Sequence, residues 1–177
     1  VAPVAHEWCE FGGGLVLIGH GGEGFAFDNE TPRHAVHLRP HALGNRLVTH
    51  GEWLDFVGAG GYTDPRWWLS AGWDWVRQQR IEAPMYWRRR AETGGWANDK
   101  AGSGPNAHRG WASFTLHGEM PVDPHTPVVH VSLYEADAYA HWRAAESGEP
   151  VRLPTEAEWE HAAQQHEAEG LAEGNFV

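Results

Sequence analysis

The sequence is poor in cysteine, in basic residues and in long apolar runs. Its 1 Cys cannot form an internal disulfide, which favours a reducing compartment, and we expect the cytoplasm. Lys and Arg number 13 against 24 Asp and Glu, a formal net charge of -11. No apolar run approaches the ~20 residues of a membrane span. We therefore expect neither nucleic acid nor a membrane as a partner.

Tryptophan, glycine and proline are abundant instead. The 177 residues suffice for one domain with a real core, and they include 11 Trp, 22 Gly and 11 Pro. Trp brings a large apolar area with one N–H that needs a partner, and Gly and Pro mark turns. This composition predicts a core of large interlocking side chains in a fold with little helix and sheet.

Three pairs of a hydroxyl residue and a glutamate have the spacing of a capping box, in which each side chain bonds the other residue's backbone N–H. The pairs are Thr49 with Glu52, Ser132 with Glu135, and Thr155 with Glu158. Each predicts a helix beginning at the next residue. Asp64 before Pro65 predicts another helical start, with a second helix from Ser70. Strands are expected over residues 12–19, 34–38 and 111–116. Residues 83–87 are expected to be a strand or an extended segment that forms a hairpin with 111–116.

One sequence block indicates a particular protein family, which the capping boxes do not. Residues 152–160 read RLPTEAEWE and follow HVS at 130–132, and this block resembles the signature of the formylglycine-generating-enzyme (sulfatase-modifying factor) superfamily. Two earlier motifs agree with it: Glu30-Thr-Pro-Arg-His34 with Val36, and Val48-Thr49 with Trp53 and Phe56. The resemblance implies an α+β, C-type-lectin-like fold with little regular secondary structure. The chain would hold the N-terminal half of that domain.

Longer segments narrow the resemblance. They are FAFDNE at 25–30, GGYTDPRWWLSAGWDWV at 60–76, and the stretch from Ala83 to Ser132. They resemble the sulfoxide synthases of ergothioneine biosynthesis (the EgtB family). That resemblance implies an oxidoreductase with non-haem Fe(II) that uses O2. Such an enzyme joins the sulfur of γ-glutamylcysteine or cysteine to hercynine, giving a sulfoxide.

In that family three His of a separate N-terminal DinB-like domain bind the iron, through H-x3-H-x-E and an earlier His. A proton-donating tyrosine lies in the later part of the lectin-like domain. The nearest match here, His37 and His41, has Leu43 in place of the Glu and Pro40 inside the motif, so we expect a surface strand edge. His161 and His166 are five residues apart, off the shared face of a helix.

We therefore assign no catalytic residue and no metal ligand to this chain, and its substrate-binding residues are unknown. Residues 1–177 are expected to form a single partial domain. The DinB-like domain and the C-terminal half would lie outside it, because the sequence ends in Glu173–Val177 without a helix C-cap. Alone, the chain should be inactive.

Other polar and aromatic residues have a structural and a functional interpretation. The cluster Asp28, Asn29, Glu30 and Arg33 could tune a substrate cleft, but Asx turns and pairing of Glu30 with Arg33 or Arg152 are favoured. Structural roles are also expected for the following residues: Glu156, Glu158 and Glu160 as partners of a helix dipole, Trp159 as a core anchor, Tyr134 and Tyr139 as half-buried packing residues, Cys9 as a small buried residue, Arg88–Arg90 as a solvated hairpin face, and 91–106 as a polar loop.

Two other functions stay open. A copper-dependent formylglycine-generating oxidase shares the superfamily signature but works through a cysteine pair, which Cys9 alone does not supply. A non-catalytic lectin-like binding module is the third possibility.

Overall fold

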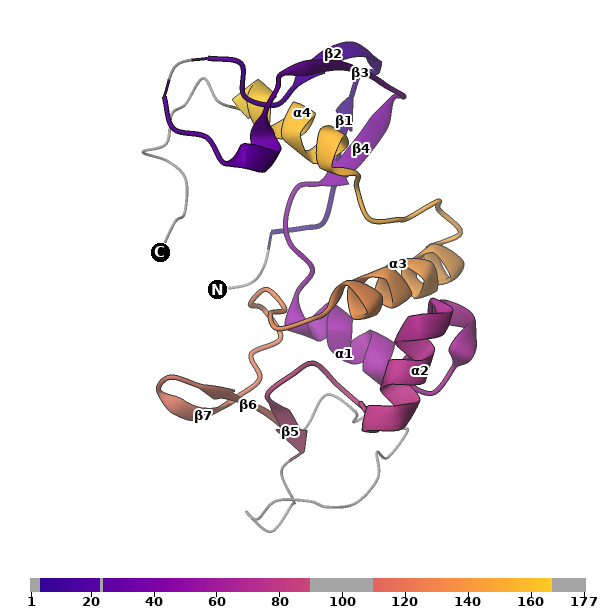
Figure 1. Ribbon diagram of the computed structural model, residues 1–177. Helices are drawn as coiled ribbons and strands as arrows, with labels where there is room; N and C mark the ends of the chain where they lie inside the picture. Colours follow the sequence, from indigo (N-terminus) through magenta and orange to yellow (C-terminus); the bar gives the residue numbers. More distant parts are fainter. Residues whose placement is uncertain (1–3, 23, 90–109, 167–177) are drawn as a thin grey trace. The chain divides into compact units, whose positions relative to one another are not determined.

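The computed structural model describes residues 4–22, 24–89 and 110–166, which form two compact units (Figure 1). The first unit contains Val4 and the described parts of Leu47–Leu153, and the second contains the described parts of Ala5–Arg46 and Pro154–Val177. Helices alternate with small antiparallel sheets, so the chain has the predicted α+β class with little regular secondary structure. The prediction of one domain over 1–177 stays a prediction.

The helices of the first unit begin where their caps predict. α1 (His50–Gly58) and α3 (Leu133–Ser147) follow Thr49 and Ser132, and both capping boxes are formed. Asp64 caps the short 3-10 helix η2 (Pro65–Trp67), and α2 spans Ser70–Gln79. α3 ends at Gly148, which has a left-handed backbone that glycine adopts at low cost.

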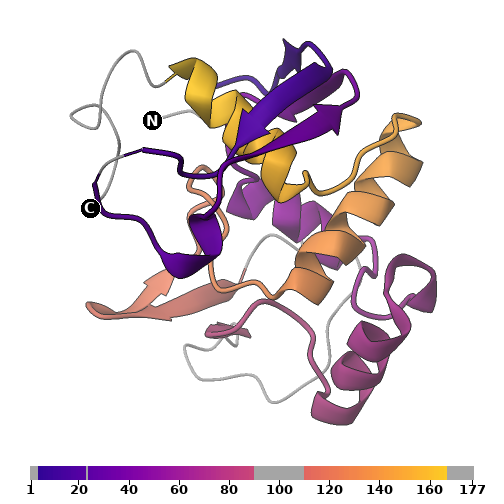
Figure 2. The ribbon, with the colours of Figure 1, turned by 45° about the horizontal axis from the view of Figure 1, so that its top comes forward.

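The core of the first unit is aromatic, as the tryptophan content predicts. Trp53 of α1 stacks on Tyr139 of α3 with ring centroids 5.0 Å apart, and Phe56 contacts both of these rings and that of Trp142. α1 lies beside α3 in both views (Figures 1 and 2). Gly61 is required here, because a Cβ at this position would lie 2.2 Å from the Phe56 ring.

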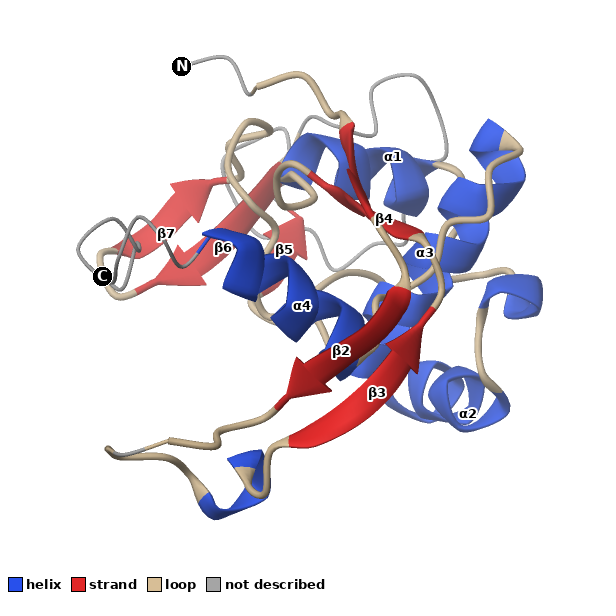
Figure 3. Cartoon of the chain, turned by 90° about the horizontal axis from the view of Figure 1, so that it is seen from above, coloured by secondary structure: helices blue, strands red, loops and turns tan. Residues whose placement is uncertain are grey.

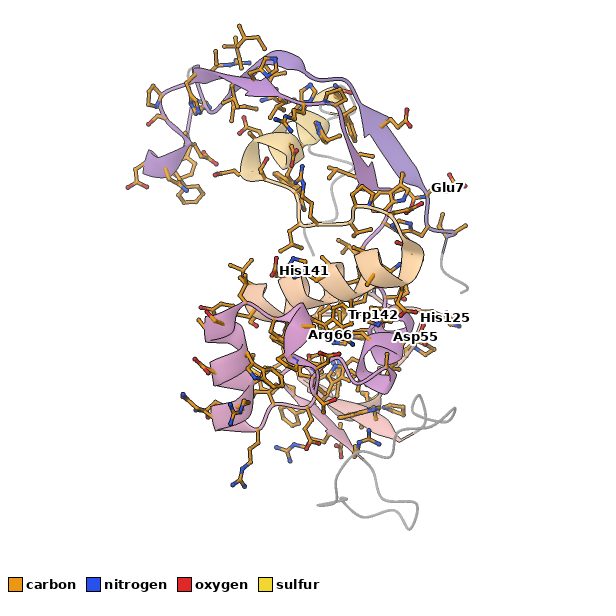
Figure 4. All side chains as sticks on the ribbon, turned by 90° about the vertical axis from the view of Figure 1, so that its right-hand side faces the viewer. Glu7, Asp55, Arg66, His125, His141 and Trp142 are labelled. Carbon is orange, nitrogen blue, oxygen red and sulfur yellow. The ribbon has the colours of Figure 1, made fainter. Side chains whose placement is uncertain are left out.

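One polar contact joins the loop of η2 to α3, and a second lies within the loop itself. Figure 4 shows His141 on α3, and its Nδ1 lies 2.9 Å from the carbonyl oxygen of Trp67. Arg66 pairs with its own cap residue, Asp64, at 2.6 Å. Both contacts orient η2, whose neighbour Trp68 donates its indole N–H to the Gly61 carbonyl inside the core.

A three-stranded sheet completes the first unit. β5 (Trp87–Arg89) pairs with β6 (Trp111–Thr115), and β6 pairs with β7 (Gly118–Pro121). The predicted hairpin between the two segments is confirmed, but the first strand begins at Trp87 and not at Ala83. Residues 83–86 form a turn in which Tyr86 has a positive φ of 71°. β7 was not predicted, because two of its four residues are Gly and Pro.

The second unit combines two β-ribbons with one helix. β1 (Trp8–Phe11) pairs with β4 (His41–Gly44), β2 (Gly14–Ile18) pairs with β3 (His34–Leu38), and α4 spans Glu156–His166. Figure 3 shows β2 and β3 side by side as one antiparallel ribbon. The 3-10 helix η1 (Asp28–Glu30) precedes β3. β1 and β4 were not predicted, since neither has the alternation of a half-buried strand.

Two burial predictions for this unit are wrong. Cys9 is exposed on β1, because Phe11 and not Cys9 reaches the cluster beside α4. Trp159 is 62% exposed, since Glu158 and Ala162, one helical turn apart, form the buried face of α4. Within the described ranges, no helix has both the length and the apolarity needed to cross a membrane.

Candidate functional site

The polar cluster at 28–33 stabilises its own turn. Asp28, Asn29, Glu30 and Arg33 are all exposed. The Glu30 carboxylate accepts a 3.0 Å hydrogen bond from the Phe27 backbone N–H, and its carbonyl accepts one of 2.7 Å from the N–H of His20. The Glu30 carboxylate thus bonds the backbone and not Arg33, so the expected pairing with Arg33 is wrong, while the pairing with Arg152, in the other unit, stays a prediction. The local geometry of η1 explains these residues without a ligand.

Two glutamates of α4 have different structural roles: Glu158 caps the start of the helix, and Glu160 bonds the backbone of a distant residue. Glu158, 6% exposed, accepts from the Thr155 N–H at 2.8 Å, and its own N–H donates to the Thr155 hydroxyl at 3.3 Å, which confirms the capping box. Glu160 does more than complement the helix dipole. Its carboxylate accepts from the Gly19 N–H at 2.7 Å and from the Gln164 amide at 2.9 Å, so it fastens α4 to the end of β2.

Two histidines meet in the second unit. The rings of His41 on β4 and His161 on α4 have centroids 5.7 Å apart, and Phe11 stacks on His41 at 5.4 Å. His41 is half-buried, so the expected surface strand edge holds for the exposed His37 and is wrong for His41. The difference arises because His41 lies on the β1–β4 ribbon, where its ring contacts His161 of α4, whereas His37 lies on the β2–β3 ribbon. The side chain of His166 lies outside the described residues.

Metal chemistry needs more donors than this pair supplies. A ferrous site in proteins commonly uses three protein ligands. Within residues 4–22, 24–89 and 110–166, no three His, Cys, Asp or Glu side chains are grouped so that they could hold a metal ion. The described residues therefore do not fit a complete iron site, and we derive no reaction step through one.

A buried polar network crosses the core of the first unit. Tyr62 donates its hydroxyl to the Glu135 carboxylate at 2.7 Å, and the Trp53 indole N–H donates to the Tyr62 oxygen at 3.4 Å. Glu135 is 2% exposed and also accepts from the Ser132 N–H at 2.7 Å. Burial, reinforced by the adjacent Glu135, raises the pKa of Tyr62 well above its usual 10.0. The network is satisfied from within, so it locks the packing of α1 against α3.

His50 joins the start of α1 to residues 123–126. Its Nδ1 lies 3.0 Å from the Asp123 carbonyl oxygen and 2.9 Å from the Thr126 hydroxyl. Burial lowers the pKa of His50, and the hydrogen bond to Asp123 opposes this shift. Because the carbonyl oxygen of Asp123 can only accept a hydrogen bond, the neutral imidazole carries its proton on Nδ1 and donates it to this oxygen. Its Nε2 is buried without a partner in the described structure.

The arginine run has two different environments. Arg88 is exposed, as expected of a solvated face, but Arg89 is half-buried with its guanidinium carbon 4.6 Å from the centre of the Trp111 ring. Arg90 and the predicted loop at 91–106 lie outside the described residues. The solvated-face prediction is therefore wrong for Arg89.

The packing role predicted for the two tyrosines of α3 is confirmed, but the predicted half-burial is correct only for Tyr134. Tyr134 is half-buried against the first unit's core, and Tyr139 is buried with 8% of its surface exposed. The Tyr62–Glu135 bond and the Glu160–Gly19 bond were both missed. A capping box gave the position of Glu135 on its helix, but its partner Tyr62 is 73 residues away. No pattern within a few residues encodes such a contact.

Residues 9–175 match the family of sulfatase-modifying factor enzyme 1-like domains. The match covers nearly the whole chain, and the chain belongs to this family, which agrees with the RLPTEAEWE block and with the α+β fold.

Individual relatives narrow the comparison. The chain is 40% identical over 138 residues to a protein named hercynine oxygenase from Mycobacterium tuberculosis, covering 77% of this chain and 26% of the relative. It is 36% identical over 140 residues to the hercynine oxygenase of Mycolicibacterium smegmatis, covering 79% of this chain and 27% of the relative. A formylglycine-generating enzyme from Streptomyces coelicolor is 36% identical over 146 residues, covering 80% and 41%.

The predicted resemblance to the sulfoxide synthases of ergothioneine biosynthesis is thereby confirmed. The chain spans about a quarter of the length of the two hercynine oxygenases that it matches.

Proposed function

We propose that this chain is part of an oxygenase that acts on hercynine in ergothioneine biosynthesis. The observation that carries the proposal is the 40% identity over 138 residues to the hercynine oxygenase of M. tuberculosis. The reaction would use non-haem Fe(II) and O2 to form a bond between the sulfur of γ-glutamylcysteine or cysteine and the hercynine imidazole. The enzyme would work in a reducing cytoplasm.

In this proposal the chain contributes framework and not iron chemistry. The iron would be held on a DinB-like domain elsewhere in the parent protein, and the proton-donating tyrosine would lie in the later part of the lectin-like domain. The capped helices and the satisfied Tyr62–Glu135 network support a framework role, because they make this part of the protein rigid.

The test is an assay of the whole parent protein. The purified protein is supplied with Fe(II), O2, hercynine and either thiol, and the products are followed by mass spectrometry. The expected product is the sulfoxide that joins hercynine to the thiol, with a preference for one of the two thiols. Consumption of O2 without a product containing both substrates would overturn the proposal.

The second candidate is a formylglycine-generating oxidase. Its support is the 36% identity over 146 residues to the S. coelicolor enzyme of that name. The same preparation, loaded with copper and given a cysteine-containing peptide, would then convert that cysteine to an aldehyde. Aldehyde formation without the sulfoxide would select this candidate over the first.

A further inference from the structure

Three large side chains share one face of the β5–β6 ladder. Trp87 and Arg89 are two residues apart on β5, and Trp111 lies directly opposite Arg89 on β6, so all three point to the same side. The indole rings are 5.8 Å apart, and the Arg89 guanidinium carbon lies 4.6 Å from the centre of the Trp111 ring. Two indole N–H groups and a permanent cation are therefore gathered at one place.

The two indole N–H groups and the Arg89 Nε–H are buried and have no acceptor among the described residues. Trp87 is 8% exposed and Trp111 is 6% exposed. Among the described residues, neither indole N–H has a hydrogen-bond partner, and the Arg89 Nε–H has none either. Leaving such a group unsatisfied destabilises the folded protein, and more so when the group is charged. Buried polar groups in native structures are almost always paired, so three unpaired donors together indicate a missing acceptor.

A bound water would pair only one of these three donors. His50 packs edge-on against Trp87 with ring centroids 5.3 Å apart, and its unpartnered Nε2 is an acceptor in the neutral tautomer. One water could therefore bridge the Trp87 N–H and His50. The Trp111 N–H and the Arg89 Nε–H would still lack an acceptor among the described residues.

We propose that the face formed by Trp87, Arg89 and Trp111 binds a small oxyanion, a carboxylate or a phosphate group. The anion accepts from the Arg89 Nε–H and from one or both indole N–H groups. Arginine suits this role because its donors match the geometry of these oxyanions. The proposal does not rest on the proposed function, because it is drawn from the geometry of the β5–β6 face alone.

The test follows the indole N–H resonances of the 177-residue chain by NMR. Trp87→Phe and Trp111→Phe assign the two signals among the 11 tryptophans. The wild type is titrated with sodium acetate, with inorganic phosphate, and with sodium chloride at matched ionic strength. We expect saturable shifts of these two signals with acetate or phosphate but not with chloride, and the stronger of the two ligands identifies the oxyanion.

Variants of the two neighbouring arginines decide the role of charge. Arg89→Gln should weaken the apparent affinity about tenfold or more, the loss expected for a charge-assisted hydrogen bond. Arg88→Gln removes the same charge from the exposed face and should leave the affinity unchanged. Arg89→Lys keeps the charge without the Nε donor and should bind the oxyanion more weakly than wild type. If Arg89→Gln fails to fold, this variant tests the role of Arg89 in its place. Stationary signals, an equal response to chloride, or wild-type affinity in both Arg89 variants would overturn the proposal.

Discussion

The carboxylate of Glu160 accepts a 2.7 Å hydrogen bond from the backbone N–H of Gly19, a residue 141 positions earlier in the chain. Gln164, one turn further along α4, bonds both Glu160 and the Leu17 carbonyl. The end of β2 is thus tied to α4 by polar contacts, in a unit where the β-ribbons are only two strands wide. Two-stranded ribbons are marginal by themselves, so the helix stabilises them.

Replacing Glu160 should destabilise the second unit. Glu160→Ala leaves the Gly19 N–H without its acceptor, and we expect a loss of about 1–3 kcal/mol in the free energy of unfolding. Glu156→Ala is the matched control, because it removes a glutamate from the exposed first turn of the same helix. The control should lose no more than ~1 kcal/mol from the helix dipole. Urea unfolding, with hydrogen exchange at the Gly19 amide, measures both, and equal losses in the two variants would refute the role of the tie.

Removing the Tyr62 hydroxyl should be costly although it removes one atom. Tyr62→Phe leaves the buried Glu135 carboxylate without one of its donors, and we expect a loss of about 2–3 kcal/mol. A double-mutant cycle with Glu135→Gln should show a coupling of about 1 kcal/mol or more, because the two groups contact each other. Additive losses would contradict the network.

The raised pKa of Tyr62 predicts that the folded protein loses stability at alkaline pH. Its pKa is raised in the folded state above the usual 10.0, so its contribution to stability is complete below pH ~10. That contribution is lost as the pH rises further, because the unfolded state releases the proton more readily. In Tyr62→Phe the decline in stability above pH ~10 should be shallower than in the wild type, as measured by urea midpoints from pH 8 to 11.

The lowered pKa of His50 predicts that stability falls as the pH falls, whereas that of Tyr62 predicts a loss as the pH rises. Its pKa is lowered by burial, so the unfolded state binds the proton more readily than the folded state. The stabilising contribution is present above pH ~6.5 and is lost as the pH falls through the lowered pKa. His50→Asn keeps a donor for the Asp123 carbonyl, and we expect its stability to fall less between pH 7.5 and 5. An equal fall in the stability of the wild type and of His50→Asn over this range would contradict the prediction.

Gly61 provides a test of core packing. In Gly61→Ala the new Cβ would lie 2.2 Å from the Phe56 ring, which is fully buried and cannot retreat. Overpacking of this kind costs about 1–3 kcal/mol. Gly12→Ala is the control, because no atom lies within 4 Å of its Cβ position. Thermal unfolding should show a lower midpoint for the first variant only, and an unchanged midpoint would show that the core is looser than the structure indicates.

Local patterns predicted the helix starts well and the burial of single side chains poorly. Thr49, Ser132 and Thr155 cap their helices as their spacing requires, because a capping box needs only residues three apart. Trp53 and Trp159 are both tryptophans on capped helices, yet Trp53 is 2% exposed and Trp159 is 62% exposed. Which of them is buried depends on the elements that pack against the helix.

The sequence by itself determined the family, the α+β class and the positions of the capped helices. Each of these is encoded either in an uninterrupted motif such as RLPTEAEWE or in the backbone hydrogen bonds of neighbouring residues. Only the tertiary structure decided that Glu135 meets Tyr62, that Glu160 meets Gly19, and that Trp87, Arg89 and Trp111 share one face. The physical reason is distance along the chain: burial and pairing are decided by which segments fold together, and polar groups find partners only when those segments meet.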